Sequence, residues 1–129
     1  MRENLFRGKD IDGKWVEGCC VVDEMDANKI YIGYIFGSDG RQPHNTDVAL
    51  VDPETVCQYT GLTDKNGRKI FEGDILSHDG VGNIKVQFKK SEFLALGITH
   101  DMFSTLLSSV YKDCEVIGSI FNNPELIGE

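Results

Sequence analysis

The residues that come nearest to a metal-binding or proton-transferring group are Asp74, His78 and Asp79. Carboxylates and imidazole coordinate metal ions and act as general acids and bases. However, the histidines of the chain match no motif such as His-x-x-x-His, and Asp79-Gly80 is a dipeptide typical of hairpin turns. We therefore interpret His78 as the exposed flank of a turn and predict no metal site. A small metal-dependent hydrolase built on these three residues is the weakest alternative.

Other candidates for chemistry are equally incomplete. Asp23, Glu24 and Asp26 lack the alternating ligand positions of a calcium-binding loop, so we interpret them as a solvated turn. No glycine-rich motif of the kind that binds phosphate is present. The remaining nucleophile candidates are the four cysteines, Cys19, Cys20, Cys57 and Cys114. They accompany no Cys/His signature, so the sequence points away from an enzyme and predicts no catalytic residue and no cofactor.

The cysteines also indicate the compartment. Cys19 and Cys20 are neighbours, and a trans peptide holds their Cα atoms about 3.8 Å apart, which is below the usual disulfide range of about 4.4–6.8 Å. No Cys-x-x-Cys pair suggests zinc. Free thiols are typical of a reducing compartment. Because the N-terminus lacks the apolar run of a signal peptide and no stretch is long enough to span a bilayer, the sequence predicts a cytoplasmic protein that binds no membrane.

Positive charge is concentrated locally at Lys85, Lys89 and Lys90, beside Phe88. Lysines and an exposed aromatic ring can form a platform for single-stranded nucleic acid. Against this interpretation, the formal net charge of −8 repels phosphate, and Phe88 is expected in the core. We therefore favour a protein partner or a second copy of the chain, and a nucleic-acid-associated module that uses the three lysines is the alternative.

The pattern of turns and apolar residues predicts a mainly β fold. Dipeptides that favour tight turns recur along the chain, at Asp12-Gly13, Asp39-Gly40, Asn66-Gly67 and Asp79-Gly80. Between them, apolar and polar residues alternate as in half-buried strands. The predicted strands cover residues 4–7, 15–22, 30–36, 48–51, 56–59, 74–77, 84–89 and 115–121. Helical spacing predicts one short helix near 101–110, and Asn123-Pro124 predicts a final helical turn.

The strand predicted over residues 15–22 has two different faces. Val16, Gly18 and Cys20 lie on a face of small and apolar side chains, whereas Glu17 and Cys19 lie on a mixed face. Because side chains alternate along a strand, we expect Cys20 to be buried and Cys19 to be exposed.

One long motif resembles the signature of YopX-like proteins, which are encoded by bacteriophages and prophages. It is QYTGLTDKNGRKIFEGDI, at residues 58–75. The resemblance extends to residues 2–7, 51–56 and 116–126, and so covers the whole chain. Departures from the family pattern are confined to Cys57 and Ser119.

The resemblance implies a mixed α/β or β-rich N-terminal subdomain followed by a small SH3-like β-barrel. The polar, turn-rich loop at residues 62–69 predicts where they divide, with the N-terminal subdomain over residues 1–68 and the barrel over residues 69–129. The resemblance implies no established activity and no catalytic residue, so we predict a non-catalytic accessory binding module in the cytoplasm of the bacterial host. Gln58, Tyr59 and Thr60 combine polar and aromatic groups that could form a binding face. The same side chains could instead bond to the loop that follows, and we favour this structural interpretation.

Overall fold

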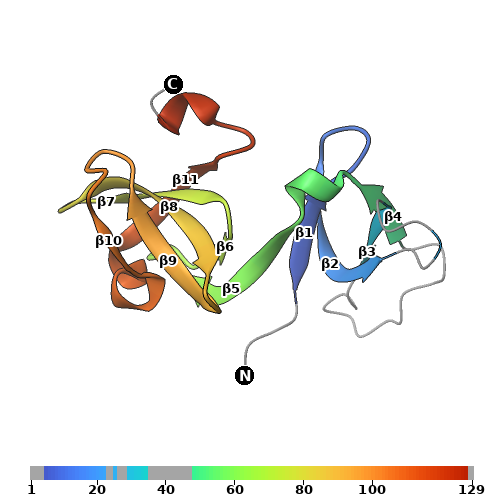
Figure 1. Cartoon of the computed structure of the whole chain (residues 1–129), viewed down its shortest axis with the longest axis horizontal. Helices are drawn as coiled ribbons and strands as arrows, with labels where there is room; N and C mark the ends of the chain where they lie inside the picture. The colour runs from blue at the N-terminus through green and yellow to red at the C-terminus, as the bar shows by residue number, and fades with distance from the viewer. Residues whose placement is uncertain (1–4, 23–24, 26–28, 35–47, 128–129) are drawn as a thin grey trace. The chain divides into compact units, whose positions relative to one another are not determined.

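The structure is a computed structural model that describes residues 5–22, 25, 29–34 and 48–127. The mainly β prediction is confirmed, because the regular elements of these residues are strands and short 3-10 helices. The chain divides into two compact units between Gln58 and Tyr59, within strand β5 (Cys57–Thr63), whereas the sequence predicts a boundary at residue 68. The ribbon in Figure 1 shows the strands of both units.

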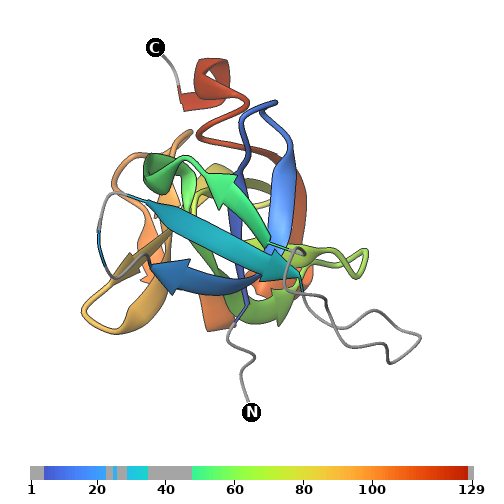
Figure 2. The ribbon, with the colours of Figure 1, turned by 90° about the vertical axis from the view of Figure 1, so that its right-hand side faces the viewer.

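The N-terminal unit contains an antiparallel sheet in the order β4-β3-β2-β1, followed by the first residues of β5. Its strands are β1 (Phe6–Lys9), β2 (Trp15–Val22), β3 (Ile30–Tyr34) and β4 (Val48–Val51). Figure 2 shows this sheet with β3 and β4 toward the viewer. The predicted strands 15–22 and 48–51 are confirmed to the residue, whereas β1 begins at residue 6 and not at residue 4.

The core of this unit lies on one face of the sheet. Val16, Ile32 and Val51 are buried together, and Cys20 packs against them. After β4 the chain forms the 3-10 helix η1 (Pro53–Thr55). Two hydrogen bonds join this segment to β1: the Asp52 amide donates to the Lys9 carbonyl at 2.8 Å, and the Lys9 amide donates to Thr55 Oγ1 at 2.9 Å. The sheet therefore curls over its own core.

Burial along β2 follows the predicted alternation. Val16 and Gly18 are buried, whereas Glu17 and Cys19 are exposed. Cys20 is half-buried and not fully buried. Only glycine fits at position 18, because a Cβ atom there would overlap the carbonyl oxygen of Gly33 on the neighbouring strand.

The C-terminal unit contains a five-stranded antiparallel sheet in the order β10-β9-β8-β7-β11. Its strands are β7 (Asp74–His78), β8 (Gly82–Lys89), β9 (Glu92–Gly97), β10 (Ser104–Leu106) and β11 (Cys114–Ser119). The rest of β5 pairs with β6 (Lys69–Phe71). The core combines Ile70 of β6 and Leu107, which follows β10, with residues on the inner face of the sheet. These sheet residues are Leu76, Ile84, Val86, Ala95, Cys114 and Val116.

The helix predicted near residues 101–110 is wrong. The segment forms β10 and the 3-10 helix η2 (Leu107–Ser109), followed by the 3-10 helix η3 (Tyr111–Asp113). Leu106 pairs with Leu94 of β9, and Met102, which the helical pattern places on the apolar face, is exposed. Tertiary pairing with β9 thus overrides a weak helical pattern in which serine and threonine are frequent.

The turn predictions hold where the structure describes them. Gly13 and Gly67 adopt φ of +78° and +85°, the left-handed region that favours glycine. Asp79-Gly80 lies in the β7–β8 turn, although the positive φ there belongs to Gly82. Asp39-Gly40 lies outside the described residues. The final helical turn is confirmed as the 3-10 helix η4 (Pro124–Ile127).

Candidate binding groove

One buried carboxylate, that of Asp64, holds the motif at residues 58–75 in place. Asp64 Oδ1 accepts hydrogen bonds from the amides of Asn66 and Arg68, both at 2.9 Å, and so closes the turn between β5 and β6. Asp64 Oδ2 accepts a third bond, also 2.9 Å, from the amide of Val116 in β11. Burial by itself raises the pKa of this carboxyl, but the three N–H donors and the charge of Arg68 outweigh it and lower the pKa. The turn is therefore fixed to β11.

A second turn of the motif fixes the entry into the sheet. Gly73 adopts φ of +87°, a backbone conformation that favours glycine, and its amide donates to the Val86 carbonyl at 2.9 Å. The buried Asp74 accepts a bond of 2.8 Å from the amide of Phe71. The motif residues thus hold β6 against β7 and β8, and they position β5 in front of the sheet.

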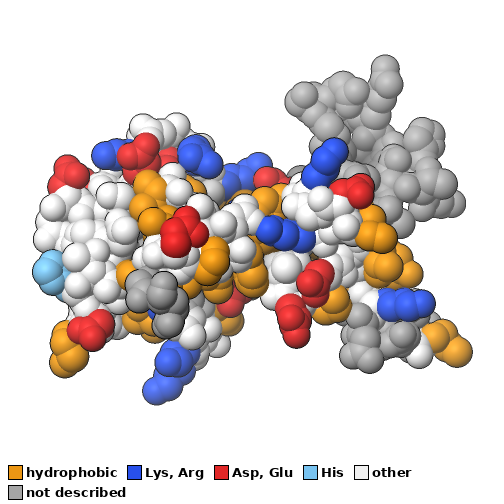
Figure 3. Space-filling view, turned by 90° about the horizontal axis from the view of Figure 1, so that it is seen from above, with side chains coloured by type: hydrophobic (Ala, Val, Ile, Leu, Met, Phe, Trp, Pro, Cys, Tyr) orange, Lys and Arg blue, Asp and Glu red, His pale blue; other side chains and the backbone are white. Residues whose placement is uncertain are grey.

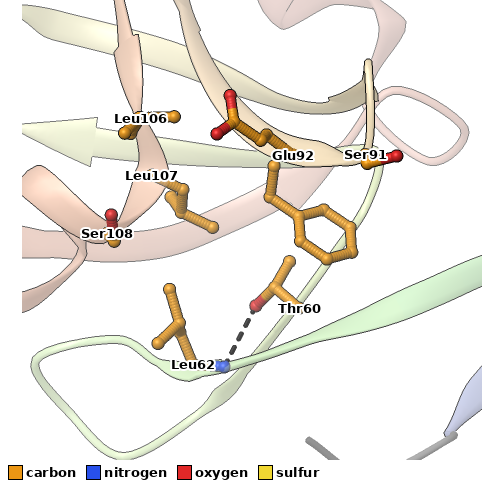
Figure 4. A pocket seen from close by; sticks show the side chains of 8 residues that line it. Thr60, Leu62, Ser91, Glu92, Leu106, Leu107 and Ser108 are labelled. Carbon is orange, nitrogen blue, oxygen red and sulfur yellow. Dashed lines mark hydrogen bonds between the residues drawn. The ribbon is translucent and has the colours of Figure 1, made fainter.

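Between β5 and the β9–β10 side of the sheet lies a shallow groove of about 290 Å³ (Figure 4). Its lining combines four apolar and four polar residues, namely Leu62, Phe93, Leu106 and Leu107 with Thr60, Ser91, Glu92 and Ser108. Leu107 is fully buried in the core, Leu62 and Phe93 are half-buried, and Leu106 is exposed at the edge. The groove therefore offers an apolar floor with a polar rim.

Thr60 fixes the β5 wall of the groove. Its hydroxyl donates to the Ile70 carbonyl at 2.7 Å and accepts from the Leu62 amide at 3.2 Å, the bond drawn in Figure 4. The wall is bent here, since the β5–β6 register shifts between Tyr59 and Thr63. The side chain of Leu62 is thereby held toward Leu107 across the groove.

The structure separates the residues predicted as a binding face. Tyr59 and Thr60 are buried, with the Tyr59 ring 5.5 Å from the Phe71 ring, and Gln58 is half-buried where β5 pairs with β1. The Thr60 hydroxyl bonds to the Ile70 carbonyl of β6, in line with the structural interpretation of that side chain, and a binding face of the three residues stays a prediction. Thr60 alone also reaches the groove.

The basic residues do not form one platform with Phe88. Lys85 and Lys89 are on the opposite face of β8 from Phe88, and Lys90 lies in the β8–β9 turn. Phe88 is exposed and not in the core, because it lies at the end of the sheet, where its ring packs 4.7 Å from that of Phe93. On the face shown in Figure 3, blue cations and red carboxylates are interspersed.

The potential metal ligands are held in separate local contacts. The buried Asp74 bonds within its own turn, His78 Nδ1 accepts a bond of 2.9 Å from the Gly80 amide, and Asp79 is exposed. Among the described residues, no three acidic, histidine or cysteine side chains converge as ligands. Asp23, Glu24 and Asp26 lie outside the part of the chain that the structure describes.

The buried thiols bond to backbone carbonyls. Cys57 Sγ donates to the carbonyl of Thr55, and Cys114 Sγ donates to that of Val110, at 3.3 and 3.2 Å. Burial, aided by the negative charges of Asp113 and Asp64, raises the pKa of the Cys114 thiol to about 11. This thiol is protonated at neutral pH and is a poor nucleophile.

The sequence pattern missed most of the groove. The pattern predicts a helix for Leu106 and Leu107, and it predicts no strand for β9, whose run from Phe93 to Leu96 is apolar without alternation. Such a run is the only local signal, and it indicates burial and not a groove.

The fold and the groove define a mainly β protein with a shallow apolar surface site in its C-terminal unit. The chain matches the YopX protein family over residues 5–128. This match covers nearly the whole sequence, so the chain belongs to the YopX family. No curated protein matches the chain closely enough to suggest an activity. Within the described residues, no helix is long and apolar enough to cross a membrane.

Proposed function

We propose that this YopX-family chain is a non-catalytic binding module that takes an apolar side chain of a protein partner into the groove of its C-terminal unit. The observation that carries the proposal is the groove itself, with its apolar floor of Leu62, Phe93 and Leu107. The groove holds about 290 Å³, at the lower end of the range of about 300–1,000 Å³ for small-molecule sites, and it is shallow, whereas such sites enclose most of the ligand's surface. Its size suits one or two anchor side chains better than a metabolite.

The surroundings of the groove favour a macromolecular partner. Leu106 is 41 % exposed at its edge, and Phe88, which packs on Phe93, is exposed beyond it. The apolar surface thus continues outside the cavity. Interface cores combine apolar anchors with a polar rim, and Glu92 and Ser108 provide such a rim.

We further infer that the C-terminal unit is an SH3-like barrel. The meander β7-β8-β9-β10 is followed by two 3-10 turns, and the last strand, β11, returns to pair with β7. This is the strand order that an SH3-like barrel requires. The register of β11 shifts between Val116 and Gly118. Such irregularities bend a strand, which favours a short strand that turns a corner of a barrel.

Three features support the rest of the proposal, a cytoplasmic accessory protein of phage or prophage origin. Family membership favours the origin, and four free thiols favour a reducing compartment. The raised pKa of Cys114 argues against a nucleophilic role for that thiol. The alternative of nucleic-acid binding is disfavoured by the net charge and by the separation of Phe88 from Lys85 and Lys89 on β8.

Site-specific photocrosslinking tests the proposal. A benzophenone amino acid replaces Leu106 at the groove edge, and in a control it replaces Ile117 of β11, which is 38 % exposed in the same unit. After irradiation in the bacterial host, we expect a protease-sensitive, nuclease-resistant adduct from position 106 and none from position 117.

Equal adducts from both positions, or none from position 106, would refute the groove as the site of binding. A nuclease-sensitive adduct would instead establish the nucleic-acid alternative. Once a partner is captured from position 106, the variant Leu106→Asp should no longer co-purify with that partner, whereas Ile117→Asp should still do so.

A further inference from the structure

The N-terminal unit has an apolar strand at the edge of its sheet. Strand β4 has the sequence Val-Ala-Leu-Val, and it pairs with β3 on one side. Among the described residues, no strand pairs with its other side. Sheet edges are usually protected by charged residues, proline or bulges. Within β4 none of these is present, and the first carboxylate and the first proline after it are Asp52 and Pro53.

A second cavity adjoins this edge. It measures about 360 Å³ and is lined by Asp10, Ile11, Leu50, Val51 and Asp52. Ile11, in the turn between β1 and β2, is 97 % exposed, and Leu50 of β4 is 50 % exposed. Among the described residues, β4 has no strand partner on this side, where only the Asp52 amide just after it is bonded, to Lys9 of β1. An apolar pocket lies beside this edge.

The two carboxylates of this lining are held in place by the backbone. Asp10 Oδ1 accepts bonds of 2.9 Å from the amides of Asp12 and Lys14. Asp52 Oδ1 accepts one of 3.0 Å from the amide of Glu54. Within the described part of the chain, the second oxygen of each carboxylate has no hydrogen-bond partner. Such fixed, acidic acceptors are suited to ammonium or guanidinium groups.

We propose that the β4 edge binds an extended, cationic segment of another protein, which adds to the N-terminal sheet as a further strand. Backbone hydrogen bonds to β4 give this mode its affinity, and side-chain pockets give it specificity. An apolar side chain of the segment packs on Ile11 and Leu50, and a lysine or arginine pairs with Asp10 or Asp52. Charge selects the occupant, because the lining carries two carboxylates and no cation.

The same charges disfavour a second copy of this chain as the occupant. A second copy carries the same net charge of −8 and the same acidic lining, and like charges across an interface are repulsive. The site is in the other unit from the groove, so the two binding proposals stand or fall independently.

A peptide titration of the full-length, ¹⁵N-labelled protein tests the edge. The probe is the acetylated, amidated peptide Lys-Val-Leu-Val-Lys, followed by backbone amide shifts. We expect saturable shifts at Ile11 and at residues 49–52. Methylation of the peptide's central amide nitrogens, which removes donors without removing charge, should weaken binding at least about tenfold, the equivalent of one or two lost hydrogen bonds. Replacing both lysines of the peptide by glutamate should abolish binding.

Protein variants provide matched controls. Leu50→Lys places a charge on the edge strand and should abolish binding, whereas Val21→Lys should leave it unchanged, since Val21 is also 50 % exposed but belongs to the interior strand β2. Asp52→Asn, which keeps an N-cap residue for η1, should weaken binding about two- to fivefold, the range of an exposed ion pair.

Three results would overturn the proposal. They are equal affinity for the plain and the N-methylated peptide, equal loss from Leu50→Lys and Val21→Lys, and the absence of shifts at residues 49–52 at millimolar peptide. Self-association of the protein that Leu50→Lys abolishes would assign the edge to a second copy and would also contradict it.

Discussion

Replacing Asp64 by asparagine should remove the main link between the β5–β6 turn and β11. The change keeps the size of the side chain but replaces Oδ2, which accepts from the Val116 amide, by an NH₂ group that can only donate. The Val116 N–H is then buried without an acceptor, which costs about 1–3 kcal/mol. The bonds from Asn66 and Arg68 lose their ionic character, which adds about 1 kcal/mol. We therefore expect a loss of about 2–4 kcal/mol in the free energy of unfolding at pH 7.

The same loss should depend on pH. The folded-state pKa of Asp64 is lowered, whereas an unfolded aspartate titrates near about 3.9. The stability that the carboxylate contributes is therefore present in full above the unfolded pKa and is lost as the pH falls through the folded value. At low pH the protonated carboxyl resembles asparagine, so the difference between wild type and variant should shrink.

Urea unfolding at pH 7 and at pH 3 measures both effects. The control is Asp101→Asn, because Asp101 is exposed in a turn of the same unit; this variant should differ from wild type by less than about 0.5 kcal/mol. A loss below about 1 kcal/mol for Asp64→Asn at pH 7, or an equal loss at both pH values, would show that the carboxylate does not hold the turn as its three hydrogen bonds indicate.

Three further predictions concern packing, thiol reactivity and nucleic acid. Gly18→Ala should destabilise the protein by more than about 2 kcal/mol, because the added Cβ overlaps the Gly33 carbonyl; unfolding curves measure this, and a loss under about 0.5 kcal/mol would contradict the strand spacing. Timed alkylation with peptide mapping should modify Cys19 first, Cys20 more slowly because burial raises the pKa of its thiol, and Cys114 last; faster reaction of Cys20 than of Cys19 would reverse the faces of β2. Fluorescence anisotropy should detect no binding of single- or double-stranded oligonucleotides at physiological salt, given the net charge of −8, and tight binding there would favour the nucleic-acid alternative.

Features that rest on local patterns could be predicted from the amino-acid sequence. Strand β2 runs over Trp15–Val22 as predicted, because an eight-residue alternation is long enough to define both its ends and its faces. The tight turns at Gly13 and Gly67 follow from residues that tolerate positive φ. Family membership also follows from the sequence, since the motif at residues 58–75 is long and contiguous.

Features that join distant residues depend on tertiary packing and could not be predicted from the sequence. Residues 104–106 form a strand because β9 offers them a partner, although their local pattern resembles a helix. Phe88 is exposed because β8 extends past the core. The alternation of Phe88 with Ile84 and Val86 does not show where along the strand the core ends. The groove joins β5 to residues 106–108, and Asp64 bonds to an amide far along the chain. Such contacts depend on how the strands pack, and packing between distant segments leaves no periodic signal in a single sequence.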